Sequence, residues 1–432
     1  MLPLSTDLTS AQFLNPNMVR IGDVSDPYPN LVSTGLDYYA DRSLLLPGCI
    51  VVADDIDPGY LQFLADVGIG APACGQIIQV PVTGTLLASC QTAVERILQR
   101  DQMIEFFLPT ASARRLVKSL GRNYQDVVWG PPPELAAKVN HKGWLRRHFD
   151  DWGQVPFPAH TIHDIGNRLA IARSTEAYTA RNQLAVVKAA NLATGEGMKF
   201  VNQTNWPAVL PYLLKRLSES GYTDEIIVER AYLPHSPFSV QLEITEGGPQ
   251  FLAVTRQIIG DHGAHSGNII STFATPEFNP STIDALIHRS MIAAGELHRL
   301  GYRGYIGFDF VRPDTGEHRS RLFFLEANGR LTGAMYPLAV MAQVLRTHGS
   351  PLIIMSDNLQ CSTNLSWPEL QEMYQAAGIL FDGYTGILPV GPRLMGTGKA
   401  MTYAVGITEA DVEHLMAQAH SILSGVLLSP SH

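Results

Sequence analysis

Two short segments of the chain place acidic and amide side chains among apolar residues. Residues 304–311 (GYIGFDFV) contain Asp309, and residues 321–330 (RLFFLEANGR) contain Glu326 and Asn328. Successive side chains of a β-strand point to opposite faces, so Asp309 would point away from its phenylalanine neighbours, and Glu326 would share a face with Asn328. If the two strands pair as a hairpin, these three side chains lie close together on one polar face.

This set of side chains predicts a metal site. Two carboxylates among apolar residues need a compensating cation, because burying an unpaired charge is costly. Carboxylate and amide oxygens are the hard ligands that suit Mg²⁺, which commonly also binds substrate phosphates. The alternative is that each acid forms an ordinary salt bridge at a strand edge. The presence of all three residues at this spacing favours a shared metal site over separate salt bridges.

A lysine followed by glycines predicts a phosphate contact. Lys188 lies in an apolar strand predicted over residues 184–190, and Gly195 and Gly197 follow it. The lysine would hold phosphates as a point charge, while the glycines let backbone N–H groups approach them. The alternative is a surface lysine beside a routine loop.

Glu229 lies in the next predicted strand, over residues 225–233. Its carboxylate could accept hydrogen bonds from a ribose, while neighbouring backbone groups contact an adenine edge. The alternative is an ordinary solvated glutamate near the end of a strand.

Two histidines lie in the glycine-rich stretch over residues 260–268 (GDHGAHSGN). His262 or His265 could orient a carboxylate substrate or accept a proton from an amine, and Asn268 closes the same stretch. The alternative is a polar loop with incidental histidines.

Three regions must position these residues. Residues 1–135 alternate apolar runs with helical stretches, including a strand over 50–53 and a helix from Pro58, which predicts an α/β domain with some parallel sheet. These residues contain no GxGxxG turn, so we do not expect a dinucleotide site there. We place the first domain boundary at the run 130–133 (GPPP), because proline and glycine interrupt regular structure. Residues 136–375 form a mixed core, and residues 376–432 a small α+β unit.

Within the core and the last unit we expect several further elements. They are a hairpin over 239–245 and 250–259, a helix capped by Ser281, the two strands that carry the acids, and a final helix over 409–423.

Composition narrows the class of protein. The 432 residues suffice for two or three domains of about 100–200 residues each. The net charge of −9 argues against a general nucleic-acid binder, which would carry a basic stripe. The scattered Cys49, Cys74, Cys90 and Cys361 indicate thiols in a reducing compartment. We find no signal peptide or spanning helix, so we expect a cytoplasmic protein without nucleic-acid or membrane partners.

The order of the motifs resembles the ATP-grasp superfamily. It runs from a lysine and glycines through a strand with a glutamate and a hairpin to an aspartate strand and a Glu-Ala-Asn strand, over about residues 136–340. Residues 140–142 (NHK) resemble the start of the ATP-grasp core, with Arg146 at the position of a second cation. The lid would cover about residues 170–235.

The resemblance implies a role for each matching residue. Lys188 and Arg146 would hold ATP phosphates, Glu229 and the backbone of 230–232 would contact adenine and ribose (through Arg230, Ala231 and Tyr232), and the three metal ligands would hold Mg²⁺ or Mn²⁺. Arg330 matches an arginine near the transferred phosphate, so it and Lys188 would be the catalytic residues. The D-alanine ligase branch has an arginine where this chain has Gly307.

Over its whole length the chain resembles the pheganomycin-type peptide ligases, which have a pre-ATP-grasp domain, an ATP-grasp core and a small C-terminal domain. This implies a ligase that joins small carboxylate and amine or peptide substrates through an acyl phosphate, in peptide natural-product biosynthesis. A homodimer is a common assembly in this superfamily. The alternatives are an ATP-grasp enzyme that activates another acid and a nucleotide-binding module without catalysis.

Overall fold

The structure is a computed structural model of the whole chain. It describes residues 3–5, 8, 11–23, 37–82, 85–98, 102–149, 155–180, 183–192, 197–233, 235–260, 265–275, 278–314, 321–349, 352–361 and 365–425.

The N-terminal region contains a parallel four-stranded sheet with the order β3-β2-β1-β4. Its strands are β1 (Met18–Ile21), β2 (Cys49–Ala53), β3 (Gln76–Val80) and β4 (Met103–Phe106). Around them are η2 (Gln12–Leu14), η3 (Asp37–Leu45), α1 (Pro58–Asp66), α2 (Gly70–Cys74), α3 (Leu86–Ser89), α4 (Gln91–Ile97), α5 (Ala111–Ser119) and α6 (Tyr124–Val127). The predicted parallel sheet, the strand over 50–53 and the helix from Pro58 are confirmed.

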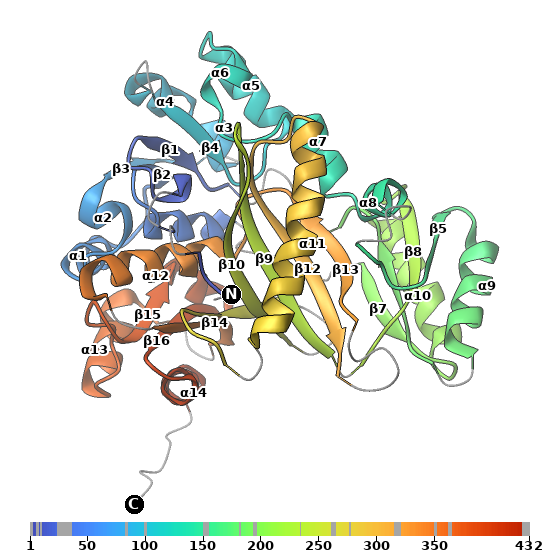
Figure 1. Ribbon diagram of the computed structural model, residues 1–432. Coiled ribbons are helices and arrows are strands. Elements are labelled where there is room, and N and C mark those ends of the chain that lie inside the picture. Colours follow the sequence, from blue (N-terminus) through green and yellow to red (C-terminus); the bar gives the residue numbers. More distant parts are fainter. Residues whose placement is uncertain are drawn as a thin grey trace, which may run out of the picture.

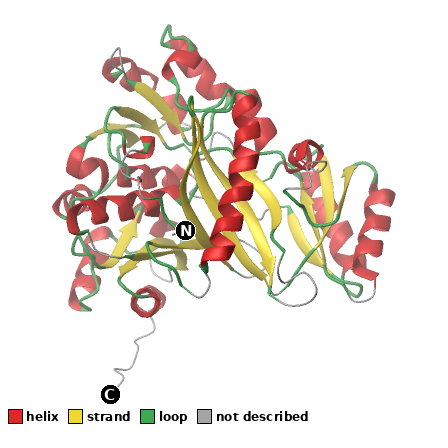
Figure 2. Ribbon diagram, viewed as in Figure 1, coloured by secondary structure: helices red, strands yellow, loops and turns green. Residues whose placement is uncertain are grey.

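An eight-stranded antiparallel sheet with the order β13-β12-β9-β10-β11-β14-β16-β15 forms the centre of the molecule (Figure 1; yellow in Figure 2). The strands are β9 (His235–Thr245), β10 (Gly248–Ile259), β11 (His265–Ser271), β12 (Gly304–Pro313), β13 (Phe323–Asn328), β14 (Ile353–Gln360), β15 (Gly386–Val390) and β16 (Lys399–Gly406). The helices of this part are α11 (Pro280–Arg299), α12 (Met335–His348), α13 (Trp367–Ala376) and α14 (Glu409–Ser424), with η7 (Pro392–Thr397).

Helix α11 crosses β9 and β10 on one face of this sheet (Figure 1). Its N-cap is Asn279, whose side chain accepts a hydrogen bond from the Thr282 backbone N–H, and Pro280 occupies the first turn. The predicted cap at Ser281 is therefore wrong by two residues. Asparagine and proline together suit a helix start because proline has no N–H that needs a partner there.

Replacing Asn279 by alanine is expected to lower the free energy of unfolding by about 1 kcal/mol, because the Thr282 N–H loses its acceptor. Urea unfolding of the two proteins measures the difference. An unchanged midpoint would contradict the capping role.

A second antiparallel sheet, which we call the lid sheet, has the order β5-β8-β6-β7 and lies at the right of Figure 1. Its elements are β5 (His160–Asp164), α9 (Arg168–Thr179), β6 (Ala185–Ala189), β7 (Met198–Val201), α10 (Trp206–Glu219) and β8 (Glu225–Arg230). It begins with His160, before the predicted start at 170, and β8 ends at Arg230 rather than at 233.

The helices α7 (Pro133–Val139) and α8 (Lys142–Phe149) link the N-terminal region to the lid sheet. The predicted boundary after residue 135 thus falls inside α7. The strands β15 and β16 extend the central sheet, so the segment after residue 375 shares a sheet with the core instead of standing apart. The three-domain division stays a prediction.

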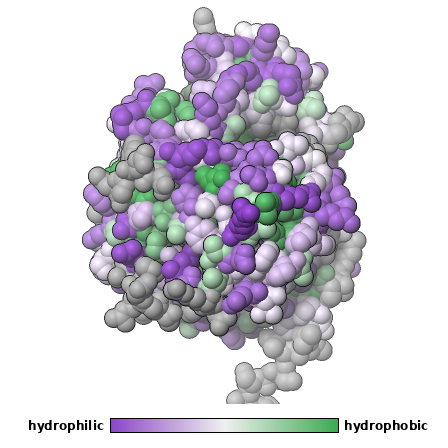
Figure 3. Space-filling model, turned by 90° about the vertical axis from the view of Figure 1, so that its right-hand side faces the viewer, coloured by the Kyte–Doolittle hydropathy of each residue, from purple (hydrophilic) through white to green (hydrophobic). Residues whose placement is uncertain are grey.

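The face on the lid side is largely hydrophilic, with hydrophobic side chains in small separate groups (Figure 3). Among the described residues, none of the helices combines the length and the apolar character needed to cross a bilayer.

Candidate active site

The strands β12 and β13 pair antiparallel and bring the three predicted metal ligands together. Asp309 lies opposite Glu326, and Gly307 lies opposite Asn328. The Asn328 amide Nδ2 donates to Asp309 Oδ2 at 2.9 Å. The shared polar face that strand alternation predicts is therefore present, although the pairing contains a bulge between Asp309 and Phe310.

The two carboxyl groups have opposite environments. Burial raises the pKa of Asp309, and the neighbouring Glu326 carboxylate raises it further, to about 7. Burial would also raise the pKa of Glu326, but Lys142, Lys188 and Arg330 lower it to about 2. Lys142 Nζ lies 3.0 Å from Glu326 Oε2. Glu326 is therefore the ionised member of the pair near neutral pH.

A chain of buried polar side chains holds Asp309 in place. The Thr332 hydroxyl donates to Gln241 Oε1 at 2.6 Å, Gln241 Nε2 donates to Ser239 Oγ at 2.8 Å, and the Ser239 hydroxyl donates to Asp309 Oδ1 at 2.6 Å. A Cβ at Gly307 would lie 2.9 Å from Thr332 Cγ2. The glycine at this position therefore leaves room for the polar chain.

Lys188, Glu229 and Arg146 form a buried ion cluster where α8 meets the lid sheet. Glu229 pairs with Lys188 through Oε1 and with Arg146 through Oε2. Arg146 is fully buried and also donates to the backbone carbonyls of Lys142 (3.1 Å) and Leu325 (3.2 Å). A phosphate or ribose could reach Arg146 or Glu229 only if these contacts opened.

The charges in this cluster stabilise one another. Burial lowers the pKa of Lys188 to about 8, although Glu229 opposes this shift. Burial would raise the pKa of Glu229, but Arg146 and Lys188 lower it below its usual value. The cluster thus contains two cations that share the single carboxylate of Glu229.

The residues predicted beside adenine lie at the end of β8. The Arg230 N–H donates to the Ala159 carbonyl and the Ala231 N–H to the Leu184 carbonyl, both at 2.9 Å, so neither points at an open edge. The Tyr232 ring stacks on Phe323 with ring centres 4.7 Å apart, and the Arg230 guanidinium lies 5.3 Å from the Tyr232 ring centre.

Gly197 has a conformational reason to be glycine. Its φ of +72° lies in the left-handed region, and an added Cβ would lie 2.8 Å from Leu192 Cδ1. Gly195 and His262 lie outside the described residues.

Arg330 lies beside the carboxylate pair. Its Nη1 donates to Asn140 Oδ1 at 2.7 Å, and the same oxygen accepts the Gly329 N–H at 3.1 Å. The guanidinium lies 5.9 Å from the centre of the Phe107 ring. No ion pair joins Arg330 to a carboxylate among the described residues.

His265 and Asn268 both lie on β11. The side chain of His265 is exposed, yet desolvation by the surrounding protein lowers its pKa. A hydrogen bond with Asn268 opposes this shift, and the positive charge of Arg42 adds to it. Asn268 is buried, and its Oδ1 accepts from the Thr255 hydroxyl at 3.3 Å. Glu326 also acts on the pKa of His265, so the two side chains lie within electrostatic reach of each other.

Sequence reasoning missed several residues of the site. Lys142 and Asn140 belong to the segment that resembles the start of the ATP-grasp core, but only the fold shows that they contact Glu326 and Arg330. Ser239 and Gln241 lie two residues apart on one face of β9, which was a usable signal for a polar pair.

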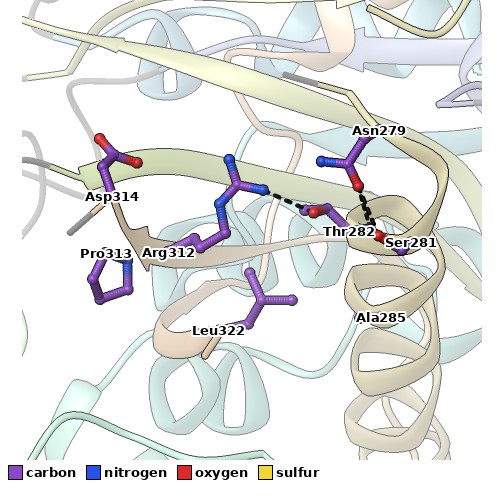
Figure 4. A pocket seen from close by; sticks show the side chains of 8 residues that line it. All are labelled: Asn279, Ser281, Thr282, Ala285, Arg312, Pro313, Asp314 and Leu322. Carbon is purple, nitrogen blue, oxygen red and sulfur yellow. Dashed lines mark hydrogen bonds between the residues drawn. The ribbon is translucent and has the colours of Figure 1, made fainter. Parts of the chain in front are cut away.

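Two other features lie apart from this site. A pocket of about 470 Å³ lies at the start of α11, where Arg312 of β12 donates to the Thr282 hydroxyl at 2.8 Å (Figure 4), and none of the predicted site residues lines it.

His141, Asp224 and Glu225 form a cluster where α8 and β8 begin, but His141 Nδ1 accepts the Trp144 N–H while Nε2 faces Asp224. A neutral histidine with this tautomer offers no lone pair to a metal.

Comparison with known proteins gives one curated relative and many similar folds. The [butirosin acyl-carrier protein]–L-glutamate ligase of Niallia circulans is 32% identical over 313 residues, which cover 71% of this chain and 61% of that protein. The chain thus spans about three fifths of the length of this relative. No protein-family model matches the chain.

Three solved structures share the fold at low identity. They are the N5-carboxyaminoimidazole synthetase of Staphylococcus aureus with ADP (TM-score 0.55, 12% identity, 93% of this chain and 96% of that one), the biotin carboxylase of Campylobacter jejuni (0.59, 12%, 95% and 92%) and the biotin carboxylase domain of Hydrogenobacter thermophilus 2-oxoglutarate carboxylase with MgADP (0.58, 10%, 93% and 89%). The chain therefore has the ATP-grasp fold of these enzymes, as the order of its motifs predicts.

Proposed function

We propose that the chain is an ATP-dependent ligase that phosphorylates a carboxylate and joins it to an amine, forming an amide bond. The observation that carries this proposal is the grouping of Asp309, Glu326 and Asn328 with the cations Lys142 and Arg330. Similarity to a ligase that acts on L-glutamate supports this choice among ATP-grasp activities. A role in peptide natural-product biosynthesis is part of the same proposal.

The donor set at β12 and β13 fits a divalent cation. Burial and the adjacent Glu326 carboxylate raise the pKa of Asp309, and a bound cation would offset the repulsion between the two carboxyl groups. Asp309, Glu326 and Asn328 would hold Mg²⁺, which would supply charge neutralisation on the ATP phosphates. An ATP-grasp structure that contains MgADP is consistent with this cofactor.

The cations around the pair divide into two groups. Lys142 forms an ion pair with Glu326 and donates to the Leu192 carbonyl at 2.6 Å, beside the lid sheet. We therefore assign Lys142, together with Lys188, to the ATP phosphates. Arg146 is fully buried, and we assign it to holding Glu229. In this proposal Arg146 acts on the nucleotide only through its neighbours.

Transfer of the γ-phosphoryl group to a carboxylate creates an acyl phosphate, which an amine then attacks with loss of phosphate. The protein contributes positioning and charge stabilisation, since carboxylates are poor electrophiles without a leaving group. Arg330, fixed by Asn140, would stabilise the negative oxygens of the acyl phosphate.

Arg330→Ala is expected to lower the rate of acid-dependent phosphate release about 100-fold, because one donor to the developing charge is lost. The dissociation constant of ATP should change little. Nucleotide binding by calorimetry and phosphate release measure the two effects. Arg312→Ala, on β12 beside the separate pocket, is the matched control. A variant that only weakens ATP binding would contradict the role of Arg330.

A second candidate concerns the molecule that carries the amine. The name of the curated relative specifies an acyl-carrier protein, so the acceptor of this chain could be attached to a carrier protein instead of being a small amine or peptide. Both candidates use the same activated acid.

The proposal is tested by phosphate release from ATP with pairs of acids and amines, including amino acids, short peptides, a carrier protein and bicarbonate, followed by product masses. A product of acid plus amine less water is expected. Release with bicarbonate alone would indicate a carboxylating enzyme, and MgATP binding without turnover for any pair would indicate a module that only binds nucleotide.

A further inference from the structure

Arg42 is a buried arginine that no sequence motif indicates. It lies in η3, only 8% of its surface is exposed, and it forms no ion pair among the described residues. Its Nε donates to the Tyr39 carbonyl at 3.0 Å, whereas neither Nη atom donates to an acceptor in the described parts of the chain. Neither Nη atom is fully enclosed either, so both reach accessible space.

Aromatic rings surround this guanidinium. Its central carbon lies 4.7 Å from the ring centre of Tyr336, 5.1 Å from that of Tyr39 and 5.9 Å from that of Phe107. Cation–π contacts stabilise a positive charge but satisfy none of its N–H donors. The rings therefore pack around the guanidinium, while its outer N–H groups have no acceptor among the described residues.

Arg42 and Arg330 both lie near the ring of Phe107. Both guanidinium carbons lie 5.9 Å from the centre of the Phe107 ring, and the Phe107 carbonyl accepts the Leu331 N–H at 3.2 Å. A Cβ added at Gly333 would lie 3.7 Å from Arg42 Nη1, so the loop after β13 passes beside this side chain.

His265 lies within electrostatic reach of both Arg42 and Glu326. The positive charge of Arg42 and the negative charge of Glu326 act on the pKa of His265 in opposite directions. Arg42 and Arg330 are thus two guanidinium groups near Phe107 that form no ion pair with a carboxylate in the described residues.

We propose that Arg42 binds a second carboxylate of the acid substrate, so that the ligase acts on dicarboxylic acids. This inference rests on the proposed function. Arg330 and the metal would serve the carboxyl group that becomes phosphorylated, and Arg42 would hold the other carboxylate, which stays unreacted. An arginine suits this task because its planar fork donates two parallel hydrogen bonds to one carboxylate.

The test uses pairs of acids that differ only at one carboxyl group, namely L-glutamate with L-glutamine, L-aspartate with L-asparagine, and succinate with succinamate. For at least one pair, wild-type kcat/KM for phosphate release is expected to favour the dicarboxylate on the order of 100-fold, since the amide leaves Arg42 unpaired. Arg42→Gln should reduce this preference to a few-fold, mainly through KM of the acid, with KM of ATP unchanged.

Two further variants separate binding from folding. Arg42→Lys keeps the charge without the fork and should retain part of the preference, and Arg312→Gln should retain all of it. Equal use of the amide by the wild type, or an unchanged preference in Arg42→Gln and Arg42→Lys, would overturn the inference and leave the ligase intact. Absence of acid-dependent phosphate release from every acid would contradict the proposed ligase itself.

Discussion

Asp309→Asn and Glu326→Gln are each expected to lower ATP turnover at least ~100-fold, because each removes a carboxylate from the proposed metal site, where charge stabilisation supplies most of the catalysis. Their effects on stability should differ in sign. Asp309 is a buried acid whose pKa is raised to about 7, so its ionised form destabilises the fold. Glu326 pairs with Lys142, and its replacement leaves that lysine without its partner.

The sign for Asp309 follows from proton linkage. An acid with a raised pKa in the folded protein binds its proton more tightly there than in the unfolded chain, so stability falls as the pH rises from about 4 to about 7. At pH 8 without metal, Asp309→Asn should therefore unfold at the same or a higher temperature than the wild type. Glu326→Gln should unfold at a lower temperature.

Phosphate release and thermal unfolding with and without Mg²⁺ measure these effects. Mg²⁺ should stabilise the wild type more than either variant, since only the wild type keeps the full donor set. Near-normal turnover in both variants would rule out the metal assignment. Equal destabilisation by both would contradict the different environments of the two acids.

The polar face that carries Asp309, Glu326 and Asn328 was predictable because these residues lie close together in the sequence. Asp309 and Glu326 lie in neighbouring strands joined by a short connection, and the two-residue period of a strand fixes which side chains share a face. The hairpin of β9 and β10 and the helices α1 and α14 were predictable for the same reason. Gly307 distinguishes this chain from the D-alanine ligase branch, and the structure adds a packing reason for the glycine, the close approach of Thr332.

The contacts that span the chain were not predictable. Lys188 and Glu229 each resembled a nucleotide contact, but antiparallel pairing of β6 with β8 places their side chains against each other. Arg330 is fixed by Asn140, 190 residues away, and Arg42 of the N-terminal region packs on the ring of Tyr336 in α12. One sequence shows the type of a side chain, but its partner depends on tertiary packing.

The strongest effect on stability is expected from Glu229→Gln. Glu229 is 1% exposed and is the shared partner of Lys188 and Arg146. Its loss leaves two buried cations without a counter-charge, and breaking a buried ion pair from one side costs about 3–5 kcal/mol. Lys188 can reduce part of this cost by releasing its proton, since its pKa is already lowered to about 8, but an arginine cannot.

Glu225→Gln is the matched control, because it lies on the same strand and pairs with Arg147, whose side chain is 52% exposed. Exposed pairs contribute at most ~1 kcal/mol, so this variant should stay close to the wild type in urea unfolding. Because Lys188 loses its counter-charge in Glu229→Gln, it releases its proton below pH 8 in the variant, so the deficit should shrink as the pH rises toward about 8 and stay level above it. A deficit that matches the control, or one that grows with pH, would contradict the buried cluster as the link between α8 and the lid sheet.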